Sequence, residues 1–253
     1  MKKIIISSEI TYFLAIALLS LAVAILSAAD FGISMIVAPA YLLSLKTGVF
    51  SFGQAEYAIQ AGLFIVLCLV LRRFKLVYLS SFITCLVYGA ALDLWRLIPF
   101  FNPAVTAPGS MATPLRVAMY ISGVLLTSFS VALFFKSYLY PQVYDFFVKA
   151  VSERYKVKLS ALKTGVDLSL LATSVIMSLC FFKKFVGIGW GTLIMAPING
   201  TLIGRFSRFL DKTCDFPPRF QKLAALFALE ENPSPAACAN AGVAEISGIH
   251  DGN

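Results

Sequence analysis

Long uncharged apolar stretches, separated by short charged segments, form the dominant pattern along this chain. The first stretch, residues 10–29, is bounded by Glu9 and Asp30 and contains no charged residue. About 20 mostly apolar residues are enough for a helix to cross the hydrocarbon core of a membrane. Five similar stretches follow, so the pattern predicts six spans. They are residues 10–29, 54–71, 76–94, 117–135, 164–182 and 185–206.

The first stretch also has features of a secretory signal. Lys2 and Lys3 precede it, and Ser27, Ala28 and Ala29 end it. Its apolar part is longer than the 7–15 residues, roughly, of a signal core. We therefore expect a retained helix, with a cleaved signal as the alternative.

Two shorter amphipathic segments, residues 34–45 and 138–157, fall between the predicted spans. They are expected to form re-entrant or interfacial helices. The proline-rich residues 99–114 predict a loop. We expect residues 1–210 to form a transmembrane domain and residues 211–253 a tail. Within the tail, residues 220–229 favour a short helix, and the Ala, Gly, Ser and Pro residues from Asn232 onward favour disorder.

Composition supports this interpretation and narrows the class of protein. Hydrophobic residues make up 59% of the chain and charged residues 13%, against about 45–50% and 25% in ordinary soluble domains. A soluble fold of this length cannot bury so much apolar surface. The chain is therefore expected to be an all-α membrane protein, with the lipid bilayer as its surroundings.

The basic residues predict an orientation. The net charge is +8, and most of the 21 Lys and Arg residues fall in segments that lie on one side if the N-terminus is inside. Basic loops are typical of the cytoplasmic side. We therefore expect a multi-pass protein of the bacterial inner membrane with both termini in the cytoplasm, and no nucleic-acid partner.

Aligning the sequence with itself so that Glu56 matches Asp167 suggests an internal repeat. Gly89 then falls on Gly200, and residues 72–74 fall on residues 183–185. Each half would hold one span, a shorter segment and a helical hairpin, over residues 10–98 and 117–208. Because three spans is an odd number, the second half would be inverted relative to the first, as in many transporters. Chance similarity among apolar helices is the alternative.

Three acids, Glu56, Asp93 and Asp167, fall within or beside the predicted spans. Acids at membrane depth are costly and are candidates for function. Gln60 follows Glu56 by one helical turn and shares its face. This polar stripe could line a cavity. Alternatively, the acids cap helices or neutralise nearby bases at the membrane surface, and the polar residues bond neighbouring helices.

Glycines recur at every second position in residues 187–192, and Pro197, Asn199 and Gly200 follow. Closely spaced glycines disfavour a regular helix, and proline removes a helical hydrogen bond. A broken helix beside a buried acid is where inverted-repeat transporters bind their substrates. Tight helix packing, with Gly200 and Gly204 as a small-residue motif, is the alternative.

The sequence resembles the bacterial YczE/YitT-like family of multi-pass membrane proteins. The matching features are Gly32-Ile33-Ser34, the acid Asp167, and the Lys-Lys-Phe-x-Gly-x-Gly-x-Gly-Thr run over residues 183–192. The resemblance covers about residues 10–210, and departs from the family at Trp190 and in the tail. It implies an integral inner-membrane protein that exports or transports an unidentified substrate.

These observations favour a small-molecule transporter in which a carboxylate carries a proton or pairs with a cationic substrate. The residues expected to bind the substrate are Glu56, Gln60, Asp167, Trp190 and Asn199. The alternative is a non-transporting scaffold or accessory protein that supports a partner complex, and a homo-oligomer is open in either case. An enzyme is not expected, because His250 is the only histidine and no carboxylates cluster. No metal or cofactor is expected either.

Overall fold

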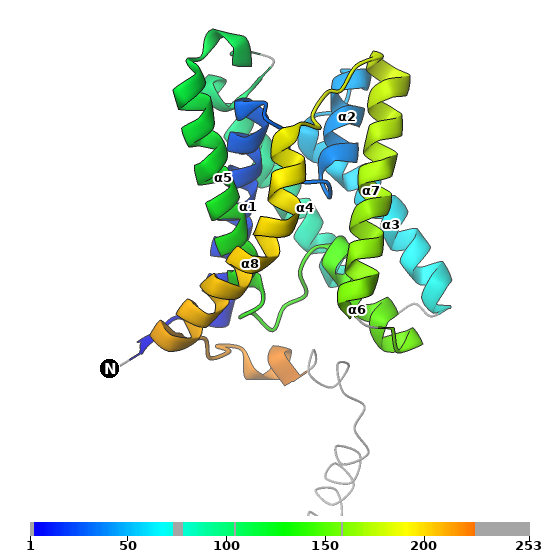
Figure 1. Cartoon of the computed structure of the whole chain (residues 1–253). Helices are drawn as coiled ribbons and strands as arrows, with labels where there is room; N and C mark the ends of the chain where they lie inside the picture. The colour runs from blue at the N-terminus through cyan, green and yellow to red at the C-terminus, as the bar shows by residue number, and fades with distance from the viewer. Residues whose placement is uncertain (1–2, 73–77, 104, 158, 226–253) are drawn as a thin grey trace, which may run out of the picture.

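Each predicted apolar stretch forms most of a helix in the computed structural model, which describes residues 3–72, 78–103, 105–157 and 159–225 (Figure 1). The long helices are α1 (Ser8–Ala29), α3 (Phe52–Leu71), α4 (Tyr78–Arg96), α5 (Thr113–Phe134), α7 (Leu159–Phe182) and α8 (Trp190–Thr213). The two amphipathic segments contain the short helices α2 (Ala38–Thr47) and α6 (Val143–Tyr155). The remaining elements are η1 (Pro99–Phe101), η2 (Pro108–Ser110), β1 (Ile4–Ile5) and β2 (Cys214–Asp215).

Five of these helices are long and apolar enough to cross a membrane, by length and composition, within the part of the chain that the structure describes. They are α1, α3, α4, α5 and residues 164–182 of α7. The all-α membrane class is therefore supported at this level. The sixth predicted span is not among them; α8 carries Arg205, Arg208, Asp211 and Lys212 in its second half.

The beginning of α8 differs from the prediction. The helix starts at Trp190 and not at residue 185. Lys183 and Gly187 both have positive φ, at 58° and 67°, so the backbone turns twice before the helix begins. The glycine run was expected to break the helix, and it does so at residues 187–189. Residues 196 and 197, by contrast, continue α8 without interruption.

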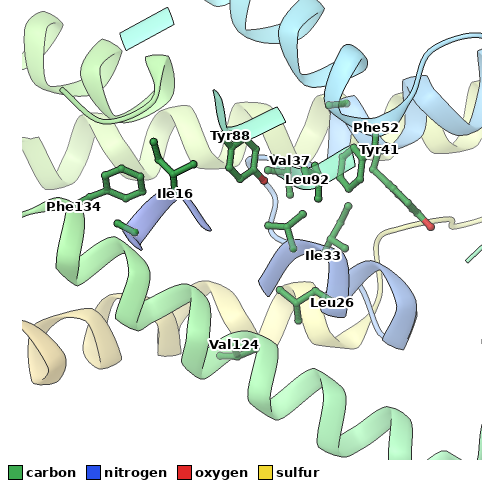
Figure 2. Packing of buried hydrophobic residues seen from close by; sticks show 14 of the residues in the cluster. Ile16, Leu26, Ile33, Val37, Tyr41, Phe52, Tyr88, Leu92, Val124 and Phe134 are labelled. Carbon is green, nitrogen blue, oxygen red and sulfur yellow. The ribbon is translucent and has the colours of Figure 1, made fainter. Parts of the chain in front are cut away.

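Helix α1 lies at the centre of the bundle and packs against α4 and α5. Its alanines at positions 15, 22, 24, 28 and 29 are fully buried, and Gly123 of α5 sits directly against Leu26. Small residues allow this close approach, which is how helices gain packing energy where lipid removes the hydrophobic driving force. The largest buried cluster joins α1 to Phe52 and Tyr88 of the first half and to Val124 and Phe134 of α5 (Figure 2).

The other helices pack in a regular set of pairs. Helix α3 contacts α2, α4 and α6, while α7 contacts α2 and α6. Helix α8 contacts α5. In the most apolar part of α7, only 11% of residues are buried, against 56% in α1. The outer face of α7 therefore offers apolar surface that lipid would cover.

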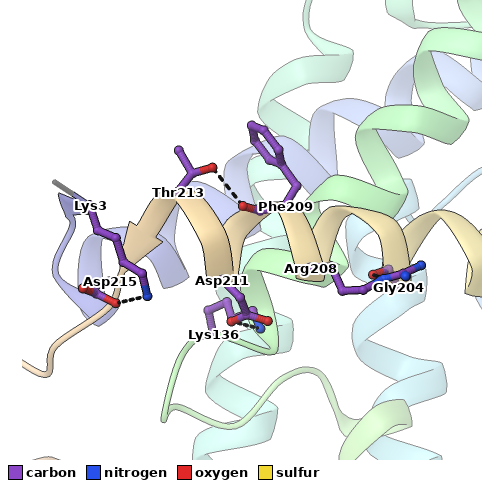
Figure 3. A network of polar contacts seen from close by, with 8 residues as sticks. All are labelled: Lys3, Lys136, Gly204, Arg208, Phe209, Asp211, Thr213 and Asp215. Atoms are coloured by element: carbon purple, nitrogen blue, oxygen red, sulfur yellow. Dashed lines mark hydrogen bonds and ion pairs between the residues drawn. The ribbon is translucent and has the colours of Figure 1, made fainter. Parts of the chain in front are cut away.

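The segments before α1 and after α8 meet at one end of the bundle. Strands β1 and β2 pair in parallel, with Ile4 beside Cys214. The ion pairs Lys3–Asp215, at 2.9 Å, and Lys136–Asp211, at 2.7 Å, lie at this same end (Figure 3).

Glu9, in the first turn of α1, holds the segment that follows β2 against this helix. Its carboxylate accepts hydrogen bonds from the backbone N–H groups of Arg219 and Phe220, both at 3.0 Å, and from the Tyr138 hydroxyl at 2.8 Å. Burial and this carboxylate raise the pKa of Tyr138 to about 12. The predicted tail helix is described only as far as residue 225, where residues 221–225 are helical. The predicted disorder from Asn232 lies outside the described residues.

Candidate functional site

A buried chain of polar side chains links α3 to the start of α6. Glu56 and Gln60 are both fully buried. Gln60 Nε2 donates to Glu56 Oε2 and to Gln142 Oε1, each at 3.1 Å. The backbone N–H of Val143 donates to Gln60 Oε1 at 3.2 Å. Gln60 therefore caps the first turn of α6 from another helix, and fixes where that short helix begins.

Four polar atoms in this region have no hydrogen-bond partner in the described structure. They are Glu56 Oε1, Gln142 Nε2 and the hydroxyls of Tyr88 and Tyr144. A buried polar atom without a partner costs about 1–3 kcal/mol, so native structures contain few of them. Several in one place indicate that water or a ligand completes their hydrogen bonds.

An inner cavity of about 60 Å³ lies beside these groups. Gln142, Tyr88 and Tyr144 line it, as does Val37, the residue before α2. The other lining residues are Leu19, Val23, Ser34, Ile36, Thr127, Val131, Phe134, Pro141, Asp145 and Asn199. Both short helices, α2 and α6, therefore begin at this cavity.

A larger outer cavity of about 410 Å³ adjoins it. Helices α5, α6, α7 and α8 all contribute to its wall. The lining residues are Ser34, Met35, Ile36, Val131, Phe135, Asp145, Thr164, Asp167, Thr192, Met195, Asn199, Gly200 and Ile203. Five of them also line the inner cavity, namely Ser34, Ile36, Val131, Asp145 and Asn199. The two cavities thus share a wall, and a few polar side chains line each of them amid mostly apolar ones.

Helix α8 is held in place through the segment between α1 and α2. The N–H of Gly191 donates to the Phe31 carbonyl at 2.9 Å, and Thr192 Oγ1 donates to the Ile33 carbonyl at 2.8 Å. A Cβ on Gly191 would overlap the Tyr120 ring and the Phe31 carbonyl oxygen. Tight packing therefore accounts for the glycine at position 191.

The other glycine motif behaves differently. A Cβ added at Gly200 or Gly204 would contact no described atom within 4 Å. The small-residue packing that this spacing suggested is not made within the part of the chain that the structure describes.

The structure brings four of the five predicted site residues to this region. Glu56 and Gln60 line neither cavity themselves but are joined by hydrogen bonds to Gln142, which lines the inner one, and Asp167 and Asn199 line the outer one. Asn199 accepts a hydrogen bond from Ser128 of α5 at 2.7 Å. Trp190 is 82% exposed and lines neither cavity. It is the first residue of α8, where Gly189 and Gly191 turn the backbone toward residue 31 and leave the indole on the outside.

The third acid, Asp93, has a structural role, as the alternative interpretation expected. Its Oδ1 accepts from the Gly53 N–H at 2.9 Å, and its Oδ2 accepts from Ser51 Oγ at 2.5 Å. Ser51 also forms a capping box with Gln54 at the start of α3. Asp93 therefore joins the end of α4 to the start of α3.

Sequence reasoning missed Tyr88, Gln142, Tyr144 and Asp145. Two of them could have been anticipated, because Gln142 and Asp145 are polar residues at the start of a predicted re-entrant helix that follows Pro141. The tyrosines gave no such signal, because aromatic residues are common on apolar helices. Only the packing of α4 and α6 places them at the cavity.

The comparisons with known proteins give a single finding. Residues 6–208 match the sequence model of a family described as a family of unknown function, DUF6198. Neither the curated proteins nor the solved structures contain a match to this chain. The resemblance to the YczE/YitT-like family stays a prediction.

Proposed function

The chain belongs to the DUF6198 family of unknown function, and we propose that it is a small-molecule transporter of the bacterial inner membrane. One observation carries the proposal. An outer cavity of about 410 Å³ shares a wall with an inner cavity that is lined by buried polar side-chain atoms without partners. Membrane binding sites are built in this way, with a few polar groups inside an apolar bundle.

The two ends of the domain support six spans. Residues 4–5 pair with residues 214–215, so the segments before α1 and after α8 lie on one face. A chain that starts and ends on one face crosses the membrane an even number of times. Five helices qualify by composition, and α8, which has 24 residues, is about 36 Å long at 1.5 Å per residue. These observations support α8 as the sixth span.

The packing pairs support an inverted repeat. In an inverted repeat, α1, α2, α3 and α4 would correspond to α5, α6, α7 and α8. The contact between α1 and α4 then corresponds to the contact between α5 and α8, and the contact between α2 and α7 corresponds to the contact between α6 and α3. The α2–α3 contact likewise becomes the α6–α7 contact, while α1–α5 maps onto itself. In Figure 1, α2 runs beside the upper part of α7 and α6 beside its lower part. The short helices therefore extend in opposite directions from the inner cavity, as re-entrant helices of inverted halves would.

In this proposal the substrate occupies the shared cavity, and the two halves rock around it. Asp167, which lines the outer cavity, carries a proton or pairs with a cationic group of the substrate, and Glu56, which lines neither cavity, is the alternative proton carrier. Asn199, which lies on the shared wall and is held by Ser128, positions the ligand. Both termini lie in the cytoplasm, because that orientation places most basic residues inside.

Topology can be tested with single cysteines. In a variant whose native cysteines are replaced by serine, Lys184→Cys lies between α7 and α8, and Lys212→Cys lies at the end of α8. A membrane-impermeant maleimide applied to intact spheroplasts should label Lys184→Cys only. Labelling of both or of neither would contradict a spanning α8, and labelling of Lys212→Cys alone would reverse the orientation.

Transport can be tested in two steps with the full chain. A thermal-shift screen of the purified protein against metabolites, ions and drugs identifies a ligand, and uptake of that compound is then measured in proteoliposomes. Asp167→Asn should abolish proton-coupled uptake, while Asp211→Asn, a matched change at an exposed ion pair, should not alter it. Normal uptake by Asp167→Asn at every pH would remove its coupling role. Absence of flux for every stabilising compound would overturn the transporter and favour an accessory protein.

A further inference from the structure

Two helix N-termini converge on the inner cavity. Val37, the N-cap residue of α2, and Gln142, the N-cap residue of α6, both line it. Neither helix has a hydrogen bond from its own N-cap side chain. The N-terminus of a helix carries a partial positive charge and directs backbone N–H groups outward, so it favours negatively charged groups.

Three unpartnered side chains that can donate hydrogen bonds line the same cavity. They are Gln142 Nε2 and the hydroxyls of Tyr88 and Tyr144. These residues are 6%, 0% and 3% exposed, so bulk water does not reach them. Tyr88 comes from α4, and Figure 2 shows its hydroxyl on the side of Val37. The orphaned Gln142 amide nitrogen is a donor and the two hydroxyls can donate, so an acceptor placed in the inner cavity would complete all three hydrogen bonds.

The outer cavity has the opposite character. Asp145 lies where the two cavities meet, and Asp167 lies in the outer one. No lysine or arginine is among the described residues that line either cavity. A ligand that spans both would thus meet donors at its inner end and carboxylates at its outer end.

We propose that the substrate is a small zwitterion of the amino-acid type. Its carboxylate occupies the inner cavity against Gln142, Tyr88 and Tyr144, and its ammonium group faces Asp145 and Asp167. This inference rests on the proposed transport function and names the substrate class for it. The volumes agree, because about 60 Å³ has room for a carboxylate and the outer 410 Å³ has room for a side chain. Glu56 does not line the inner cavity, and Gln60 stands between it and Gln142.

Matched probes can test which end of a ligand matters. The purified full-length protein is titrated with L-leucine, with isoamylamine (leucine without its carboxylate) and with 4-methylpentanoate (leucine without its amine). L-Alanine, ethylamine and propionate form a second, smaller set. In at least one set the amino acid should raise the midpoint of thermal unfolding more than either fragment. An amine that stabilises as strongly as its amino acid, or no stabilisation by either amino acid, would overturn the proposal.

Conservative variants keep the test independent of folding. Tyr144→Phe removes one unpartnered hydroxyl, so it should leave the unliganded protein as stable as before. It should weaken amino-acid binding about tenfold or more, which is typical for losing a hydrogen bond to a charged group. Tyr57→Phe is the control, because its hydroxyl is already bonded to the Leu86 carbonyl, at 2.9 Å, and it lines neither cavity. Unchanged affinity in Tyr144→Phe would contradict the carboxylate position.

The two proposals fail in distinguishable ways. Proteoliposomes that take up isoamylamine but bind no amino acid would leave the transporter standing and overturn the zwitterion. Amino-acid binding that is weakened by Tyr144→Phe, without any flux, would support the site and overturn transport.

Discussion

The hairpin of α3 and α4 and the pair of α7 and α8 occupy matching places in the two halves, but they are built differently. Helices α3 and α4 make extensive contact, while α7 and α8 make no comparably extensive contact among the described residues and diverge in Figure 1. The outer cavity is lined by residues of both α7 and α8. The cavity therefore lies where the second half departs from the arrangement of the first.

The close packing of α3 and α4 has identifiable causes. Gly53 and Gly89 face each other, and a Cβ on either would overlap the backbone carbonyl of the other. The Tyr57 hydroxyl donates to the Leu86 carbonyl. Asp93 accepts from the N–H of Gly53. These contacts join the start of α3 to the last turns of α4.

Helices α7 and α8 are each held by other neighbours. Helix α7 packs against α2 and α6, and α8 packs against α5. Tyr120 of α5 donates to the Gly191 carbonyl at 2.6 Å, and Ser128 donates to Asn199. If the halves rock as proposed, closing the outer cavity would bring α7 and α8 toward the arrangement of α3 and α4.

The largest expected effect comes from filling the glycine contact of the first hairpin. Gly89→Ala places a methyl group against the Tyr57 ring and the Gly53 carbonyl. Overpacking of this kind costs about 1–3 kcal/mol. Thermal unfolding of the protein in detergent should show a clearly lower midpoint.

Gly200→Ala, at the position that corresponds to Gly89, is the matched control. Its Cβ would meet no described atom, and alanine favours a helix over glycine by up to about 1 kcal/mol. It should be neutral or slightly stabilising. Equal losses of stability in Gly89→Ala and Gly200→Ala would contradict the difference in packing between the two hairpins.

The next effect concerns the polar link at the start of α3. Asp93→Ala removes the acceptor for Gly53 N–H and Ser51 Oγ. Loss of a helix-capping acceptor costs about 0.5–2 kcal/mol. The midpoint of thermal unfolding should fall, and Asp93→Asn, which keeps one oxygen acceptor, should recover part of the loss. Wild-type stability in Asp93→Ala would mean that the glycine contact alone holds the hairpin.

A smaller effect is expected in the second half. Ser128→Ala removes the donor to Asn199 that joins α5 to α8. A single neutral hydrogen bond contributes about 0.5–1.5 kcal/mol. Because this bond joins α5 to α8, the variant should also make a cysteine at another position on the wall of the outer cavity, Ile203→Cys in a variant without its native cysteines, react faster with maleimide. Unchanged reactivity would indicate that α8 is positioned by apolar packing alone.

The smallest effect is expected at the exposed end of the bundle. Asp211→Ala breaks the ion pair with Lys136. The Asp211 side chain is 59% exposed in this pair. Exposed pairs contribute about 0–1 kcal/mol and weaken in salt. The change in unfolding midpoint should be small at low ionic strength and absent in high salt. A large loss of stability that does not depend on salt would mean that this ion pair contributes substantially to the stability of the domain.

The sequence predicted most of the helices, because a helix that crosses lipid must be apolar over its whole length. The ends of the first five predicted spans agree with helix ends to within a few residues. The beginning of α8 was placed too early, because hydropathy alone does not register the positive φ angles at Lys183 and Gly187. Trp190 was assigned to the site from its position in the glycine run, but the direction of its side chain depends on how that run packs.

The candidate site was only partly predictable. Glu56, Gln60, Asp167 and Asn199 stand out as polar residues in apolar surroundings. Their arrangement around two cavities depends on the contacts of α2 and α6 with α3 and α7. Tyr88 and Tyr144 belong to the site only because their hydroxyls are buried without partners, and burial is a property of the packed bundle.

The pattern of residues along the chain was enough to predict an all-α membrane protein, the rough limits of five of its apolar helices, and the few polar residues that they carry. These follow from local chemistry, because a residue's polarity and its neighbours along the chain decide whether a segment can lie in lipid. Only the tertiary structure decided that α3 and α4 close together while α7 and α8 stay apart, and that two helix starts meet at one cavity. Those features depend on contacts between residues far apart in the chain, which the pattern along it does not contain.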